Sequence, residues 1–456
     1  SEYQGRRAPK ETELEGSEWT AAMTNSDHTS YNSPKLCLEV RRMETLWNSW
    51  MSVRSRAIHS RNPETKSDAR KIDQNPQRAL RQIHEQLRRG TFRFELQRGV
   101  LKKRKGKDPR PLVVSPVANR IVQRAILETL QNQKAKVRSA LGEIPSYLNT
   151  PTSVGGLPKR GAQDAVRLIR GAIQNGAEYF IRSDIKDFFT GIPTAKLVAW
   201  IGEQTGDAEF AKLIEMGLKV ELANANDPMV QEWFALFPDG ETGVPQGSSL
   251  AAYFANVTLA RFDAELNANN IVTIRYIDDF VILGQSEADV QTAWKTAEMI
   301  LGELNLQVHQ PVVGGSKASL GKVSSGFDFL SYRFDHANVG VSRTAKAKFL
   351  ESVKQTLREG KNEIRTSLRA QRRAEQRFIQ TLNSLDRRIR GWGDSFQDVT
   401  LRVQFDQIDK QISDEIREFM GWYRRISANL DDSNKRRALG VALLSDTPKR
   451  GESGSQ

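Results

Sequence analysis

Two adjacent aspartates, Asp278 and Asp279, are the residues of this chain whose types and spacing most clearly allow chemistry. They lie between two short apolar runs, 271–274 and 280–283, which are rich in β-branched residues and bounded by turn formers. This pattern predicts a β-hairpin with the two carboxylates at its tip. Neighbouring carboxylates repel each other unless a cation neutralises them, so the pair indicates a Mg²⁺ platform for nucleotidyl transfer. An ordinary acidic turn is the alternative, because aspartate is common in turns.

A second carboxylate site lies upstream, at Asp184. Residues 180–189 predict a strand that ends at Asp184 and then turns toward a helix. Two-metal phosphoryl transfer needs carboxylates from separate elements around two cations about 3.5–4 Å apart. One cation lowers the pKa of the attacking 3′-hydroxyl, and the other neutralises the triphosphate and the leaving pyrophosphate. We therefore expect Asp184 and Asp278 to bridge the metal ions, with Asp279 adding charge nearby.

The charge of the chain predicts a polyanionic partner. Its 456 residues can support two or three domains with a core, and they carry a formal net charge of +13. The basic residues gather in two runs, from Arg88 to Arg110 and from Lys354 to Arg390. Such a run is often only a solvated helix face, but two runs on either side of an acidic site favour a nucleic-acid channel.

Other classes of protein are disfavoured by composition. The single cysteine, Cys37, excludes a disulfide framework and a cysteine-based zinc site, and the five histidines lack metal-ligand spacing. Apolar runs stay well short of the roughly 20 residues that a membrane span needs, and the first residues lack a signal-peptide pattern. We expect a cytoplasmic protein with no membrane partner.

Apolar periodicity predicts the elements around the two carboxylate sites. Helices are expected at 36–59, 76–89, 119–130 and, as a long basic region, 344–425. Strands are expected at 91–94, 100–101 and 111–114. Residues 145–161 are expected to form a loop, and Trp392 and Trp422 are expected to anchor the packing of the basic helices.

Several blocks follow one another in the order of a known family. They are 107–112 with 118–123; Asp184 to Phe189; 243–250 with 255–256; Tyr276 to Asp279; Lys317, nine residues before Gly326; Phe329 to Tyr332; and Arg390 to Trp392. On these blocks the chain resembles a reverse transcriptase, most closely the bacterial group II intron-like branch, from about Gly90 to Tyr423.

The resemblance implies an α+β right-hand polymerase, with fingers and palm built on an antiparallel sheet and an all-α thumb. It implies a flexible tail at 1–35, fingers and palm at 36–335, a basic thumb at 336–445 and a second flexible tail at 446–456. The implied activity is RNA-directed DNA polymerisation, in which dNTPs extend a DNA primer or a protein hydroxyl. The template would be RNA, with a dedicated noncoding RNA as one candidate. Oligomeric state and priming are left open.

The resemblance also assigns the site residues. Asp184, Ile185, Asp278 and Asp279 would hold two Mg²⁺ ions, with Mn²⁺ as the alternative ion. The residues implied for dNTP binding are Lys103, Arg110, Lys186, Asp187, Phe188, Phe189, Gln246, Gly247 and Lys317. Those implied for primer and template are Tyr276, Phe329, Leu330, Tyr332, Arg390 and Trp392.

Physical chemistry supports these roles and leaves alternatives open. Arg110 and Lys103 can donate to a triphosphate, Gly247 allows close approach of the backbone, and Lys317 could act as general acid toward pyrophosphate. In this family an aromatic at Phe189 presses on the sugar and excludes a 2′-hydroxyl. The alternatives are core packing for Phe189 and the primer-grip residues, and a solvated charge for Lys317.

The chain also departs from the family pattern. Ser249 and the pair 251–252 replace the usual Pro and Ser-Pro, and 155–160 is a loose version of a template-contacting loop. No endonuclease motif follows the thumb, which favours a free-standing bacterial enzyme, for example in antiphage defence. Two rival interpretations are an RNA-binding maturase or chaperone and an RNA-templated RNA polymerase. The clustered acids disfavour the first, and Phe189 disfavours both.

Overall fold

A computed structural model describes residues 35–104, 107–267, 271–336, 338–370 and 377–446 of the chain. The two predicted tails, 1–35 and 446–456, lie almost wholly outside these residues. Among the described helices, none combines the length and apolar character needed to cross a membrane.

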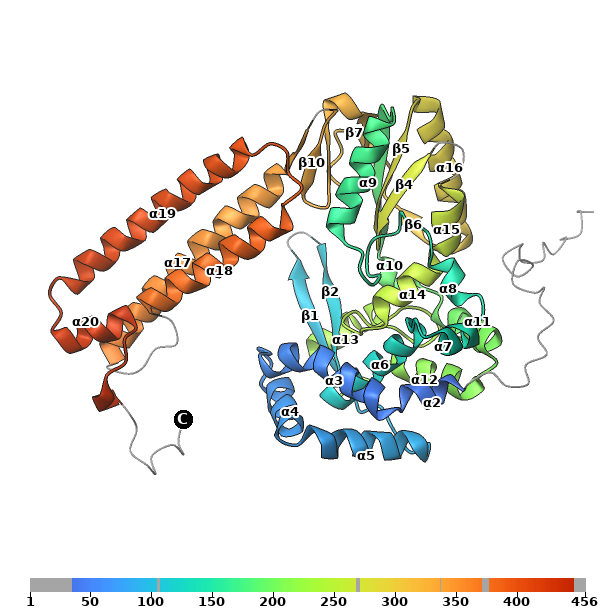
Figure 1. Cartoon of the computed structure of the whole chain (residues 1–456), viewed down its shortest axis with the longest axis horizontal. Helices are drawn as coiled ribbons and strands as arrows, with labels where there is room; N and C mark the ends of the chain where they lie inside the picture. Colours follow the sequence, from blue (N-terminus) through green and yellow to red (C-terminus); the bar gives the residue numbers. More distant parts are fainter. Residues whose placement is uncertain (1–34, 105–106, 268–270, 337, 371–376, 447–456) are drawn as a thin grey trace, which may run out of the picture.

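The centre of the molecule is a mostly antiparallel sheet (Figure 1). Its strands run in the order β4 (Val272–Tyr276), β5 (Asp279–Gly284), β3 (Tyr179–Lys186), β8 (Ser319–Lys322) and β7 (Val312–Val313). The short β6 (Gln307–Val308) pairs with the end of β3, and β7 runs parallel to β8. The predicted hairpin is confirmed as β4 and β5. Strand β3 lies beside β5, so Asp184 comes close to the aspartates at the tip of the hairpin.

Helices cover both faces of this sheet. The side chains of β5 alternate: Phe280 and Ile282 join one core with α16 (Glu287–Glu303), while Val281 and Leu283 join another with α9 (Ala162–Gln174). This explains why 280–283 is apolar throughout, since a strand buried on both faces needs no polar side.

A helical layer with one β-hairpin precedes the sheet. Its helices are α2 (Leu36–Val40), α3 (Met43–Ile58), α4 (Pro63–Gln74), α5 (Pro76–Arg88), α6 (Val117–Leu130) and α7 (Ala135–Ala140). Its hairpin is formed by β1 (Arg98–Arg104) and β2 (Lys107–Val114). Between β3 and β4 the chain is helical, with α10 (Phe188–Gly191), α11 (Thr194–Thr205), α12 (Ala208–Leu218), α13 (Pro228–Glu232), α14 (Ala251–Thr258) and α15 (Ala260–Glu265).

Three predictions for the N-terminal half are corrected. The helix expected at 36–59 is broken at Arg41–Arg42. In one straight helix the buried Val40 and Leu46 would lie about 120° apart around the axis, so they would not face the same core. Residues 91–94 do not form a strand; the backbone of Glu95 exchanges hydrogen bonds with the Asn119 side chain instead of a neighbouring strand. The predicted loop at 145–161 includes most of a short helix, α8 (Ile144–Tyr147).

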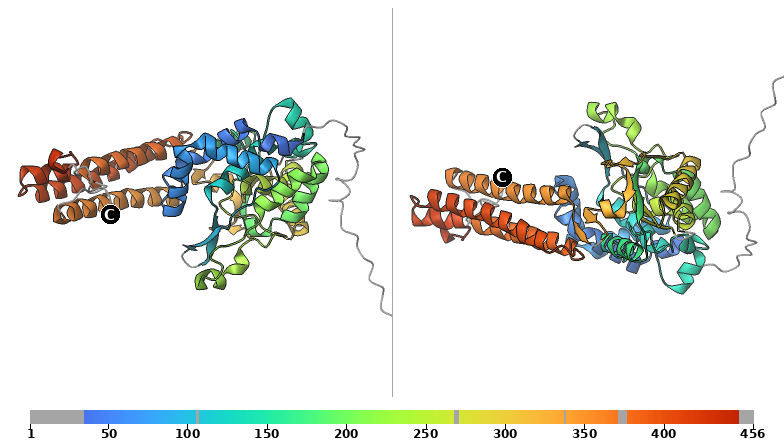
Figure 2. Two further views of the ribbon diagram at one scale, coloured as in Figure 1. Left: turned by 90° about the horizontal axis from the view of Figure 1, so that it is seen from below. Right: turned by 90° about the horizontal axis from the view of Figure 1, so that it is seen from above.

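The C-terminal part begins with a small sheet of β9 (Phe327–Phe329), β10 (Tyr332–Phe334) and β11 (Val339–Val341). Helices α17 (Arg343–Ala370), α18 (Phe378–Ser395) and α19 (Val403–Ser427) then form an arm that extends away from the rest of the molecule (Figures 1 and 2). Both α18 and α19 pack on α17, and α20 (Asp432–Leu439) lies at the far end.

The two predicted tryptophan anchors are confirmed. Trp392 stacks on Phe349 with ring centroids 4.2 Å apart, and Trp422 is buried beside Phe419. The predicted fold class is also confirmed, because an α+β body with a mostly antiparallel sheet is followed by an all-helical arm.

Candidate active site

Three carboxylates meet at one end of the central sheet. In the pairing of β3 with β5, Asp184 lies opposite Asp279, and the Ile185 amide donates to the Asp278 carbonyl over 3.1 Å. Asp278 and Ile277 form the turn between β4 and β5. Ile277 has a φ of 62°, a left-handed conformation that β-branched residues rarely adopt. The geometry thus brings together acids that are almost a hundred residues apart in the chain.

Asp184 is held by basic side chains. Lys317 Nζ donates to Asp184 Oδ2 over 2.9 Å, and His309 Nε2 lies 3.8 Å from the same oxygen. Pairing of β6 with β3 brings His309 here, and its carbonyl accepts from Ser183 Oγ over 2.6 Å. The sequence around His309 gives no sign of this contact, since nothing local predicts that a two-residue strand pairs beside Asp184.

The remaining two carboxylates carry unneutralised charge. Burial and then repulsion by Asp278 and Asp184 raise the pKa of Asp279 to about 6, although its surface stays open to solvent. The pKa of Asp278 is also raised, first by burial and then by Asp184, while Arg110 and Lys317 oppose the shift. Burial, reinforced by the neighbouring carboxylates, thus disfavours the charged forms of Asp278 and Asp279, and a bound cation would favour them.

The donor set fits a divalent cation in its chemistry. Carboxylate and carbonyl oxygens are hard ligands of the kind that Mg²⁺ and Mn²⁺ prefer. Within the described residues, however, no three side chains of His, Cys, Asp or Glu are gathered closely enough to make a ready cage. Asp184, Asp278 and Asp279 are the side chains that would hold such an ion.

A cleft of about 500 Å³ opens beside these acids. The predicted residues that line it are Arg110, Asp184, Ile185, Lys186, Asp187, Phe188, Phe189, Gln246, Asp278 and Lys317. Lys103 does not line the cleft, whereas its neighbour Arg104 does, because successive side chains of a strand point to opposite faces.

The turn after β3 separates the two phenylalanines. Asp187 takes a left-handed φ of 44°, and its carbonyl accepts from the Thr190 amide. Both residues line the cleft, but Phe188 is buried in the core at 2% exposure, while Phe189 is half-buried and packs at the edge of the same core. Of the pair, Phe189 is the aromatic available to a bound nucleotide.

Gln246 and Gly247 are tied to the strand that carries Arg110. The Val113 amide of β2 donates to the Gln246 carbonyl over 3.0 Å. Gly247 has a φ of 115°, and a Cβ there would lie 2.9 Å from the Val113 carbonyl oxygen. Only glycine fits this close approach.

The structure does not bring the predicted primer and template residues to the cleft. Phe329 and Tyr332 are buried in the core, and the Tyr332 hydroxyl donates to the Ser395 carbonyl over 2.5 Å. Leu330 lies in the turn between β9 and β10, with a φ of 49°. Phe329 and Tyr332 therefore pack in the core, which was the alternative interpretation for these residues.

The other three predicted contacts lie elsewhere. Tyr276 is half-buried and pairs with Asp279 across the hairpin. Arg390 is exposed on α18 and pairs with Asp386 over 2.9 Å, and Trp392 packs within the arm. Their roles toward nucleic acid stay predictions.

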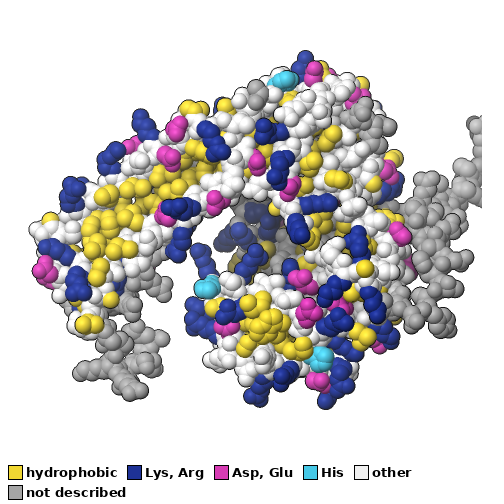
Figure 3. Space-filling view, in the orientation of Figure 1, with side chains coloured by type: hydrophobic (Ala, Val, Ile, Leu, Met, Phe, Trp, Pro, Cys, Tyr) yellow, Lys and Arg dark blue, Asp and Glu magenta, His cyan; other side chains and the backbone are white. Residues whose placement is uncertain are grey.

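Basic side chains surround the approach to the site. The space-filling view is hollowed between the arm and the rest of the molecule, and Lys and Arg side chains gather on both sides of the hollow (Figure 3). Such an arrangement attracts a polyanion.

Comparison with known proteins identifies related sequences. The family model described as "Reverse transcriptase (RNA-dependent DNA polymerase)" matches residues 100–334. "Protein YkfC" of Escherichia coli (strain K12) is 23% identical over 263 residues, covering 49% of this chain and 62% of that protein. "Group II intron-encoded protein LtrA" of Lactococcus lactis subsp. cremoris is 25% identical over 185 residues, covering 40% of this chain and 27% of the relative.

Two further similarities have low coverage or low structural agreement. The "Uncharacterized 91 kDa protein in cob intron" of Schizosaccharomyces pombe is 26% identical over 217 residues, which are 48% of this chain and 24% of that protein. A chain of the solved structure "Cas6-RT-Cas1--Cas2 complex" aligns with a TM-score of 0.33 and 20% sequence identity. The alignment covers 61% of the present chain and 29% of the chain in that complex. The chain thus spans less than two thirds of the length of each relative.

Proposed function

Because this chain belongs to the reverse transcriptase family, we propose that it is an RNA-directed DNA polymerase, a nucleotidyltransferase that adds dNTPs to a growing strand. The observation that carries the proposal is that Asp184 and Asp278 line one cleft with Arg104, Arg110 and Lys317, while Asp279 pairs with Asp184 across the sheet beside it. Acids crowded beside bases at one sheet end suit a bound metal and a triphosphate better than they suit folding.

Enzymes of this family generally use divalent metal ions. We propose two Mg²⁺ ions, with Mn²⁺ as the alternative, held by Asp184, Ile185, Asp278 and Asp279. When bound, such ions supply charge neutralisation at the triphosphate and a lower pKa at the attacking 3′-hydroxyl.

The chain's own groups would bind and orient the nucleotide. Arg110 and Arg104 face the cleft and can donate to phosphate oxygens, and Lys186 adds charge at the turn after β3. Phe189 would press on the sugar, which would favour dNTPs over rNTPs. Lys317, beside Asp184, is the group proposed to deliver a proton to the leaving pyrophosphate.

The larger substrate would lie in the basic hollow. We propose that the arm acts as the thumb and that an RNA template, paired with a DNA primer or product, lies between it and the sheet. The exposed arginines of α18, Arg387, Arg388 and Arg390, support phosphate contacts along a duplex.

The experiment that tests this function is incorporation of labelled dTTP on a poly(rA) template with an oligo(dT) primer. Asp278→Asn is expected to abolish incorporation while the protein stays folded, because a neutral amide cannot balance the charge of the metal ions. Asp432→Asn is the matched control, since it makes the same change at a fully exposed carboxylate of α20. Full activity of Asp278→Asn would contradict the site.

The same assay separates the alternative functions. An RNA-binding maturase or chaperone would retain the template without incorporation, and an RNA-templated RNA polymerase would prefer rNTPs. Phe189→Ala is expected to admit rNTPs in the DNA polymerase, measured as a lower dNTP over rNTP preference.

For the biological role we propose a bacterial enzyme of antiphage defence. Expression of the chain in a phage-sensitive bacterium is expected to lower plaque number, and Asp278→Asn is expected to restore it. Equal plaque numbers with and without the active chain would contradict this role.

A further inference from the structure

An arginine with no exposed surface lies directly behind the active-site turn. Arg275 of β4 is 0% exposed and makes a two-pronged ion pair with Asp263 of α15, with Nε–Oδ1 and Nη2–Oδ2 distances of 2.6 and 2.5 Å. This pair neutralises both buried charges, as a charge removed from water requires. It leaves further N–H groups of the guanidinium for other acceptors.

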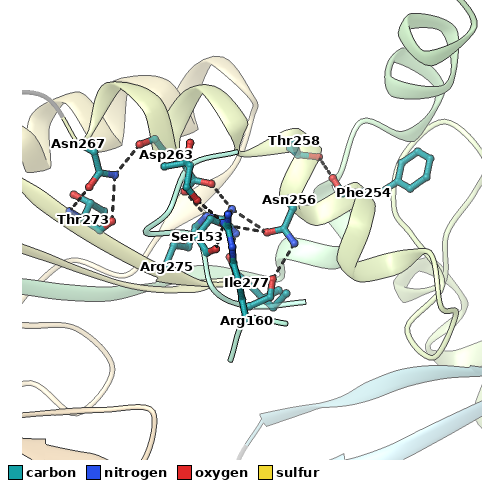
Figure 4. A network of polar contacts seen from close by, with 12 residues as sticks. Ser153, Arg160, Phe254, Asn256, Thr258, Asp263, Asn267, Thr273, Arg275 and Ile277 are labelled. Carbon is teal, nitrogen blue, oxygen red and sulfur yellow. Dashed lines mark hydrogen bonds and ion pairs between the residues drawn. The ribbon is translucent and has the colours of Figure 1, made fainter. Parts of the chain in front are cut away.

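Those N–H groups reach three other segments of the chain (Figure 4). The second N–H of Nη2 is shared between Ser153 Oγ, at 2.7 Å, and Asn256 Oδ1, at 2.9 Å. Nη1 donates to the Ile277 carbonyl over 2.8 Å. One side chain therefore connects the loop at 150–161, α14 and the turn that carries Asp278.

The bond to Ile277 acts on Asp278 through the backbone. The Ile277 carbonyl and the Asp278 amide belong to one rigid peptide plane. The next plane is held by the Ile185 amide, which donates to the Asp278 carbonyl. Both planes around Asp278 are thus fixed by groups outside the turn, and the left-handed Ile277 needs such support because its conformation is strained.

The loop at 150–161 is attached to the same place. Backbone bonds join Val154 to the Arg275 carbonyl over 2.9 Å and Arg275 to the Thr152 carbonyl over 3.0 Å. Gly155 packs so closely under the turn that a Cβ would lie 2.6 Å from the Ile277 nitrogen, and its carbonyl accepts from Asn256 Nδ2. A displacement of this loop would therefore be transmitted to the turn.

We propose that Arg275 is a positioning residue, which sets the orientation of the Asp278 carboxylate toward the metal ion by holding the Ile277 carbonyl and by joining that turn to α14 and the loop at 150–161. The inference rests on the proposed function. A purely structural ion pair would stabilise the fold without affecting the metal or the chemical step.

Two variants separate positioning from stability. Asp263→Leu with Arg275→Met removes the whole buried pair, which is often tolerated when both charges leave together. Arg275→Lys keeps a charge against Asp263, but one ammonium cannot reach acceptors on every segment. Thr273→Val is the matched control, since Thr273 is buried on the same strand and bonds to the Leu266 carbonyl, with no contact to the turn.

The full-length protein is tested in three ways: thermal unfolding, steady-state incorporation of dTTP, and Mn²⁺ binding without nucleic acid by electron paramagnetic resonance. We expect both test variants to stay folded and to lose kcat on the order of 100-fold, the effect of a misplaced catalytic group, with KM for dTTP within about threefold. Half-saturation by Mn²⁺ is expected to rise about tenfold or more in both, following the lost orientation of Asp278. Thr273→Val is expected to match the wild type in kcat and in Mn²⁺ binding, and to unfold at a somewhat lower temperature because the Leu266 carbonyl loses its donor.

Wild-type kcat and Mn²⁺ binding in either folded variant would overturn the proposal. If the double variant does not fold, Arg275→Lys decides in the same way. An inactive wild type would overturn the polymerase function instead, and the Mn²⁺ comparison would still test the orientation of Asp278.

Discussion

Arg275 and Asp278 lie only a few positions apart on the β4–β5 hairpin, but the charge of the first is neutralised within the chain and that of the second is not. Around Arg275, a positive and a negative side chain are buried together and each finds partners. Around Asp278, burial and repulsion between neighbouring carboxylates raise the pKa values of Asp278 and Asp279. The first arrangement is complete within the chain, while the second is completed by something the chain must bind.

The largest expected effect comes from removing one partner of the buried Arg275–Asp263 ion pair. Asp263→Asn leaves the Arg275 charge buried without its counter-ion, so the free energy of unfolding should fall by about 3–5 kcal/mol. Asp278→Asn should leave it unchanged or raise it, since it relieves repulsion. Urea unfolding of both variants without metal measures this. An equal loss of unfolding free energy in the two variants would contradict the difference between the two groups.

The next effect concerns the base beside the acids. Lys317→Met removes the ammonium that bonds to Asp184 and the proposed proton donor, so kcat should fall by about 100-fold or more. Stability should change by less than about 1 kcal/mol, because the pair is partly exposed. Lys322→Met, on the neighbouring β8, is the control in steady-state incorporation, and similar kcat values in the two variants would contradict the role of Lys317.

A smaller effect is expected where the cleft depends on glycine. Gly247→Ala adds a Cβ against the Val113 carbonyl at a positive φ, which should cost about 1–3 kcal/mol of unfolding free energy and weaken dNTP binding. Gly391→Ala on α18, where a Cβ meets nothing within 4 Å, should stabilise slightly. Chemical denaturation and KM for dTTP test both, and a neutral Gly247→Ala would argue against the close approach.

The smallest effect is the pH dependence of the unneutralised acids. The pKa of Asp279 rises from 3.8 to about 6 on folding, so between these values the folded chain keeps a proton that the unfolded chain has released. Unfolding free energy should therefore fall as pH rises through this window, by less than about 1 kcal/mol because Asp279 is open to solvent. Urea unfolding in EDTA measures it, and Asp279→Asn should remove this contribution; a slope unchanged in that variant would contradict it.

Local pattern was enough for several elements of the site. The β-branched runs on either side of Asp278 and Asp279 predicted the hairpin, and the segment before Asp184 predicted its strand. Periodicity also predicted the helical, basic arm and its anchors Trp392 and Trp422. These features depend on neighbours in the chain, which a sequence displays directly.

Other features depended on contacts that no local pattern shows. Alternation along β1 puts Lys103 and Arg104 on opposite faces, but only the packing of the hairpin decides that the face with Arg104 lines the cleft. His309 reaches Asp184 through pairing of β6 with β3. Phe329 and Tyr332 match a family block, yet their side chains pack in the core. Arg275 also escaped notice, because arginines are mostly exposed and its burial follows from elements folded over it.

The sequence by itself determined that acids would stand at strand ends and at a hairpin tip, since alternation and turn chemistry act over a few residues. Only the tertiary structure decided that Asp184 faces Asp279, that Lys317 bonds to Asp184, and that Arg275 supports the turn. The physical reason is that strand order and side-chain burial are set by packing between distant segments, whose pairing no single stretch of residues encodes.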